Sequence, residues 1–161
     1  NSFTVSGLYG VDEGENANGI GFFARTKKTA NIHDFSLVNT YFESTTSNGM
    51  GGIASRGQGI FRNLHTDVIL YNGLEEVLND KDELQASKVY AGGIVGLAFG
   101  ELVIEDCWSE SDITAAGRYA GGIVGSANKQ KVTIEHCLNT GNLYRFGKYA
   151  NENKSQNRHD I

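Results

Sequence analysis

The sequence has no proline, two cysteines and one tryptophan among 161 residues. Two cysteines are too few for the disulfide framework of many small secreted domains, so the core must come from apolar packing. No apolar run approaches the roughly 20 residues that cross a bilayer, so we expect no membrane insertion in this segment. Lysine and arginine number 14 against 19 acidic residues, and the net charge of -5 argues against a nucleic-acid partner.

One seven-residue phrase, Tyr-Ala-Gly-Gly-Ile-Val-Gly, is present at residues 90–96 and again at 119–125. Each copy is followed by an Ile-x-x-Cys phrase, which ends at Cys107 and at Cys137. A repeat of about 30 residues is typical of solenoids, propellers or arrays. Two weaker copies precede these, and the equivalent glycines are Gly21, Gly52, Gly93 and Gly122, with spacings of 31, 41 and 29.

Each repeat contains three short apolar segments, and none of them is long enough for a helix. Three strands in about 30 residues predict an all-β fold: a parallel β-solenoid, or three-sided β-helix, of about four coils of 29–31 residues. A propeller blade would need about 40 to 45 residues, more than the two clearest repeats contain.

Stacking of the coils should place equivalent residues in apolar columns, because a single coil cannot bury these faces alone. The four predicted columns are Phe22, Ile53, Ile94 and Ile123; Ile32, Phe61, Ile104 and Ile134; Phe35, Leu64, Cys107 and Cys137; and Tyr41, Leu70, Ile113 and Leu143.

A fifth column predicts the backbone geometry. Asp34, Asn63, Asp106 and His136 directly precede the third apolar column. Asp, Asn and His are enriched at positive φ, so we expect a sharp corner there in every coil. The glycine pairs at 92–93 and 121–122 predict another corner or a crowded approach of two backbones.

The spacing of 41 residues predicts an insertion at 71–89 within a repeat domain that spans 1–147. Leu74, Val77, Leu78 and Leu84 have helical spacing, so the insertion should be a short helix or an excursion from the stack. The phrase restarts at Tyr149 but is abandoned, and residues 148–161 are expected to form a polar C-terminal tail.

The repeats resemble the GLUG-type family of bacterial repeats. The residues that carry this resemblance are Gly93–Gly96 and Gly122–Gly125, the Ile-x-x-Cys phrases, and Asn139–Leu143. The resemblance implies an extracellular or cell-surface bacterial protein, such as an adhesin-like protein or the non-catalytic region of an IgA-cleaving metallopeptidase. It implies no catalytic residue within the repeats.

The residues themselves also favour a non-catalytic segment without a metal or cofactor. The His-Glu-x-x-His pattern of zinc peptidases is missing from the sequence. Cys107 and Cys137 should be free, buried thiols rather than a disulfide, since in-register side chains point the same way. A polysaccharide-degrading β-helix would need carboxylates and a base in one groove, for which Asp106, Glu110, Asp112 and Arg118 are candidates.

Three aromatic residues are candidates for ligand contact. Trp108 follows the inward Cys107 and should therefore point outward, while Tyr90 and Tyr119 should form a ladder or simply stack between coils. We expect a non-catalytic module for structural display or adhesion to a host or environmental glycan or protein. The alternatives are an accessory region of a secreted metallopeptidase and a polysaccharide-degrading enzyme.

Overall fold

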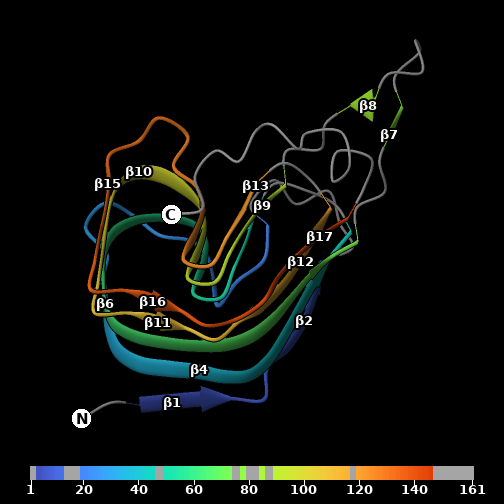
Figure 1. Cartoon of the computed structure of the whole chain (residues 1–161). Helices are drawn as coiled ribbons and strands as arrows, with labels where there is room; N and C mark the ends of the chain where they lie inside the picture. Colours follow the sequence, from blue (N-terminus) through green and yellow to red (C-terminus); the bar gives the residue numbers. More distant parts are fainter. Residues whose placement is uncertain are drawn as a thin grey trace.

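The computed structural model describes residues 3–12, 19–45, 49–73, 77–78, 84–85, 89–116 and 119–146. In these residues the fold is all-β, without a helix, and most strands are parallel members of one twelve-stranded sheet (Figure 1). The prediction of an all-β chain with parallel strands is therefore confirmed. The described residues include no helix that is long and apolar enough to cross a membrane.

The strands follow the repeats along the chain. The first repeats contain β1 (Phe3–Ser6), β2 (Tyr9–Asp12), β3 (Phe23–Arg25), β4 (Asn31–Ser44), β5 (Met50–Gly51) and β6 (Ala54–Asn72). After the short strands β7 (Val77–Leu78) and β8 (Leu84–Gln85) come β9 (Tyr90–Gly92), β10 (Val95–Glu105), β11 (Trp108–Ser109) and β12 (Asp112–Ala116). The last repeat contains β13 (Tyr119–Gly121), β14 (Val124–Ser126), β15 (Val132–Glu135), β16 (Leu138–Asn139) and β17 (Leu143–Phe146).

Successive repeats lie on one another in register. Ile32 of β4 pairs with Phe61 of β6, which pairs with Ile104 of β10, which pairs with Ile134 of β15. The same order holds further along, where β11 lies between β6 and β16 and β12 lies between β6 and β17. Figure 1 shows these strands following the same curved path, one above another.

The predicted columns form about half of the described core, nine of its nineteen buried residues. Strand pairing and backbone hydrogen bonds confirm the first three, and Phe61, Leu64, Ile53, Ile94 and Ile104 are almost completely buried. Regular spacing between parallel strands brings equivalent side chains into contact between layers, so the repeat itself explains the burial.

The fourth column was wrong at one position. Phe42, not Tyr41, pairs with Leu70, because β4 has one residue more than β6 between Leu37 and Thr40. Asn39 in this bulge has a φ of 49°. An extra residue moves every following side chain to the other face of the sheet, so Phe42 is buried and Tyr41 faces outward.

The predicted corner is present in all four repeats, because each residue of the fifth column has a positive φ. Asp34, Asn63, Asp106 and His136 have φ values of 60°, 48°, 54° and 53°. Asn63 Nδ2 also donates a hydrogen bond to Asp34 Oδ1 over 2.6 Å, and His136 Nδ1 lies 3.4 Å from Asp106 Oδ1. The positive φ therefore explains the recurrence of Asp, Asn and His at this position.

The first glycine of each pair ends a strand, and the second begins a bend, at 93–94 and at 122–123, that contacts the opposite wall. A Cβ on Gly93 would collide with Ser109 Oγ and the Gly122 carbonyl, and a Cβ on Gly122 would collide with Asn139. The crowded approach is thus confirmed. Side chains on that wall are small and polar, and Ser111 Oγ lies 3.1 Å from Thr66 Oγ1.

Within the predicted insertion, Tyr71 and Asn72 still belong to β6, and the short strands β7 and β8 form an antiparallel pair. Val77 pairs with Gln85 and Leu78 with Leu84, which corrects the helical alternative at these residues. Their opposed directions let a short connection join them, whereas a parallel pair would need a long crossover. Residues 74–76, 79–83 and 86–88 of the insertion, and the predicted tail 148–161, lie outside the described residues.

Candidate functional site

The most extended candidate site is one face of the twelve-stranded sheet, which we term the outer face. It consists of outward side chains of β1, β2, β4, β6, β11, β12, β16 and β17 and of the short links between β11 and β12 and between β16 and β17. This curved wall runs along the lower side of Figure 1 and rises at its right. Strand register arranges them in four columns, with one exception at the bulge, where Ser6 pairs with Val38 and Asn39 reaches Ser6 through a hydrogen bond from Nδ2 to Oγ. The columns are Thr4, Ser36, His65, Trp108 and Leu138; Ser6, Asn39, Asp67, Glu110 and Thr140; Tyr9, Tyr41, Ile69, Asp112 and Asn142; and Val11, Glu43, Tyr71, Thr114 and Tyr144.

Exposed apolar side chains gather on this face. The described residues include twelve large hydrophobic side chains that are exposed, and seven of them belong to the outer face: Tyr9, Val11, Ile69, Tyr71, Trp108, Leu138 and Tyr144. Single exposed apolar residues are common, but a contiguous group on one face is typical of an interaction surface.

Trp108 is 40% exposed and is held by both neighbouring layers. Its ring stacks on the His65 imidazole, with centroids 4.7 Å apart and an angle of 23° between planes. The indole N–H donates a hydrogen bond to Thr140 Oγ1 over 3.0 Å. The side chain is therefore fixed in place on the outer face, with one side of its ring covered by His65.

The outer face is also acidic. Its described side chains include those of Glu43, Asp67, Glu110 and Asp112 but no lysine or arginine. Glu43 accepts a hydrogen bond from the Tyr41 hydroxyl over 2.9 Å, and Asp112 accepts one from Asn142 over 2.8 Å. Burial and the hydrogen bond to Glu43 raise the pKa of Tyr41 to about 12, so this phenol stays neutral.

The described lysine and arginine side chains that form ion pairs or a cation–π contact lie on other walls of the molecule. Arg62 forms an ion pair with Glu105 over 2.6 Å, and Lys131 forms one with Glu101 over 2.8 Å. The Arg25 guanidinium lies 3.9 Å from the centre of the Phe99 ring. These residues lie on β3, on the first part of β6, on β10 and directly before β15, so these cations are separated from the outer face.

Tyr90 and Tyr119 stack on each other, with ring centroids 5.2 Å apart and an angle of 19°. They belong to β9 and β13 of a separate three-stranded sheet, which also contains β5. The structure thus brings these two residues together but does not join them to Trp108 in a single site. Their contact is the simple stacking between layers that the sequence left open.

A cavity of about 530 Å³ lies at the last described repeat, next to Tyr119. Its wall is mostly apolar and includes Val124, Val132 and Ile134. Val124, Val132 and Ile134 belong to the layer that ends the described stack, so their upper side meets no further described strand. The cavity is therefore the end of the core rather than a separate reaction site.

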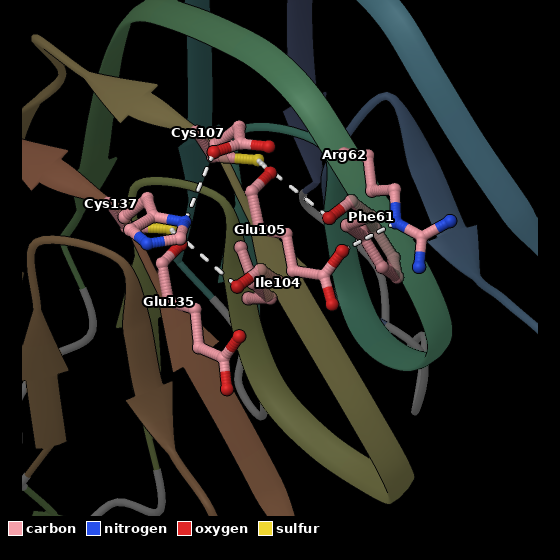
Figure 2. A network of polar contacts seen from close by, with 9 residues as sticks. Phe61, Arg62, Ile104, Glu105, Cys107, Glu135 and Cys137 are labelled. Carbon is pink, nitrogen blue, oxygen red and sulfur yellow. Dashed lines mark hydrogen bonds and ion pairs between the residues drawn. The ribbon is translucent and has the colours of Figure 1, made fainter.

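Cys107 and Cys137 are free thiols in successive layers, as expected (Figure 2). Cys107 is buried, but Cys137 is only partly buried, which corrects the expectation of two buried thiols. Each sulfur lies near the carbonyl oxygen two residues earlier, at 3.1 Å from that of Glu105 and 3.2 Å from that of Glu135. The column's other members are Phe35 and Leu64, and the described residues hold no group of three metal-binding side chains.

The two thiols have different acidities because they interact. A hydrogen bond with Cys107 lowers the pKa of Cys137 to about 7, whereas the same bond and burial raise the pKa of Cys107. Cys137 is thus the more acidic and the more accessible nucleophile of the pair.

We expect Cys137 to react with iodoacetamide at a rate that rises with pH to a half-maximum near pH 7. Below that pH the thiol is protonated and unreactive; above it the thiolate dominates. Mass spectrometry of the alkylated peptides measures the rate at each thiol, and Cys107 should stay unmodified in the folded protein. Equal labelling of both thiols, or a half-maximum near pH 9, would contradict the assignment.

The candidate residues for polysaccharide cleavage do not form one group. Glu110 and Asp112 lie on the outer face, where Glu110 Oε2 is 2.8 Å from His65 Nε2 and no described lysine or arginine accompanies them. Asp106 lies at the corner beside His136, and Arg118 lies outside the described residues. The described arrangement therefore offers no shared groove with a carboxylate and a base.

Comparison of the chain with protein-family models, curated proteins and solved structures finds no match. The outer face itself was largely missed from the sequence, where only Trp108, Glu110 and Asp112 among its residues were candidates. A usable signal was the alternation in β6, where His65, Asp67, Ile69 and Tyr71 lie between buried residues.

Proposed function

We propose that the chain is a non-catalytic, three-sided parallel β-solenoid module of a bacterial secreted or cell-surface protein. The in-register stacking of the repeats and their resemblance to GLUG-type repeats support this proposal. Its function is adhesion: the outer face binds a host or environmental glycan or protein.

The observation that carries the proposal is the clustering of exposed apolar side chains around Trp108 on the outer face. Binding energy at macromolecular interfaces is concentrated in a few residues, among which Trp and Tyr are enriched. Trp108 is held by His65 and Thr140 before any partner arrives. A side chain that is already ordered loses less conformational entropy on binding, which favours affinity.

Trp108→Ala should weaken binding to a captured glycan or matrix protein by about 10-fold or more, as expected for an aromatic hot spot. The experiment screens the whole chain on a glycan array and on immobilised matrix proteins, and then measures affinity for the strongest binder. Tyr119→Ala is a matched control, because Tyr119 is 42% exposed but lies outside the outer face.

The control should bind as the unchanged chain does, and circular dichroism should show that both variants are folded. Failure of the unchanged chain to bind any glycan or matrix protein contradicts the proposed function. An equal loss in both variants contradicts the assignment to the outer face.

A further inference from the structure

We propose that the partner of the outer face is a protein surface that combines lysine or arginine with apolar side chains. This inference rests on the proposed function of the outer face and names the class of its ligand. It follows from the charge of the face, from the contacts its carboxylates already make, and from the orientation of Trp108.

The negative charge on the outer face is not neutralised within the described residues. Glu43 and Asp112 accept hydrogen bonds from neutral groups, and Glu110 meets His65, whose imidazole is charged only when protonated. Asp67 has no polar partner among the described residues. By contrast, Glu101 and Glu105 on another wall are each paired with a cation. A partner that brings lysine or arginine would complement the outer face, whereas a polyanionic ligand would be repelled.

The exposed apolar side chains indicate that the partner supplies apolar surface as well as positive charge. Ile69, Tyr71 and Trp108 lie next to the carboxylates of Asp67, Glu110 and Asp112 in the columns of the face. Burial of apolar area favours association, and a cation near a Trp or Tyr ring adds a cation–π contribution. A basic and partly apolar protein surface satisfies both features.

A neutral glycan fits the same face less well. It would desolvate the carboxylates without supplying a compensating charge, which is unfavourable. Sugar stacking would also need a free ring face, but His65 covers one face of Trp108, and Leu138 is its register neighbour in the layer on the other side. The indole N–H is already donated to Thr140. The observations therefore favour a protein over a glycan.

The size of the face bounds the affinity. The six steps from His65 to Tyr71 cover about 20 Å along a strand, and the layers cover about 20 Å across it. This area is at the lower end for specific protein interfaces. We therefore expect binding in the micromolar range with a strong dependence on salt, because exposed charges are screened.

Trp108 is the only tryptophan in the chain, so its fluorescence reports directly on the outer face. The probes are a synthetic peptide of alternating lysine and leucine, the same peptide with glutamate in place of lysine, and a neutral glucose oligosaccharide. The whole chain is titrated with each probe at low and at high salt. The lysine peptide should change the fluorescence and bind, more weakly at high salt, while the other two should not bind.

Two double variants with the same change in charge localise the binding. Asp67→Asn with Glu110→Gln removes two carboxylates from the outer face and should weaken lysine-peptide binding about 5-fold or more. Glu101→Gln with Glu135→Gln removes two carboxylates from the other wall and should change it less than 2-fold. Equal weakening by both doubles would mean that only net charge attracts the peptide, which overturns the inference.

The failure of this inference differs from the failure of the proposed function. If the oligosaccharide binds at Trp108 and the lysine peptide does not, the partner class is wrong while adhesion through the outer face stands. If the lysine peptide and the oligosaccharide both leave the fluorescence unchanged, the inference is overturned; the array and matrix-protein screen then decides the function by itself.

Discussion

Phe61→Ala is expected to lower the free energy of unfolding by about 3–5 kcal/mol, the range for truncation of a buried phenylalanine. Phe61 is the largest of the fully buried side chains and has no exposed surface. It lies in the middle of its column, between Ile32 and Ile104. Hydrogen-bonded strands hold the layers on both sides at a set spacing, so the cavity cannot close by collapse.

Urea unfolding followed by circular dichroism measures this change, and Phe99→Ala is a matched control. Phe99 is also an aromatic residue of the sheet, but it is 39% exposed and its ring contacts the Arg25 guanidinium. Its truncation should cost about 0.5–1 kcal/mol, mainly from the lost cation–π contact. A loss below about 1 kcal/mol for Phe61→Ala would show that the column is not tightly packed.

Gly93→Ala should destabilise the chain by about 3 kcal/mol or more, beyond the usual range for overpacking. The added methyl group would meet Ser109 Oγ on the opposite strand and the Gly122 carbonyl in the next layer. Backbone atoms cannot rotate away as a flexible side chain can. The clash could therefore be relieved only if the bend at 93–94 moved away from β11 and from the bend at Gly122. That movement would loosen two contacts of the bend at once.

Gly73→Ala is the control for this substitution, because its new methyl group would approach only the Tyr71 side chain, at 3.1–3.7 Å. That side chain is partly exposed and can shift, so the change in stability should stay below about 1 kcal/mol. Thermal unfolding compares the two variants. Similar melting temperatures for Gly93→Ala and the unchanged chain would mean that the close approach is not needed for folding.

Both predictions depend on the repetition of layers. In a stack, each repeat contacts mainly its neighbours, and stability is close to a sum of repeat and interface contributions. A defect at Phe61 or Gly93 disturbs the interfaces on both sides of its layer. We therefore expect substitutions in the central layers to cost more than equivalent substitutions in the last one, where Ile134 is only partly buried.

The sequence predicted the columns and the corners well because repetition supplies several independent observations of one position. Asp34, Asn63, Asp106 and His136 share little chemistry except tolerance of positive φ, and all four adopt it. The prediction at Tyr41 was wrong because a bulge adds one residue to β4, and the apolar pattern of Tyr41 and Phe42 does not show which of them points inward. Of the two predictions for the insertion, a short helix or an excursion from the stack, the helix was wrong at Val77–Leu78 and Leu84–Gln85, because short apolar runs fit either period.

The sequence by itself determined which residues are equivalent between repeats, and with them the parallel register and the core. The spacing of the repeats along the chain decides which residues are equivalent, since each layer repeats the strands of the layer before it. Only the tertiary structure decided which outward side chains become neighbours, because residues of the outer face come from strands about 30 to 45 positions apart in the chain. The meeting of Trp108 with His65, and the separation of the acidic outer face from the paired cations, are consequences of stacking that no local pattern contains.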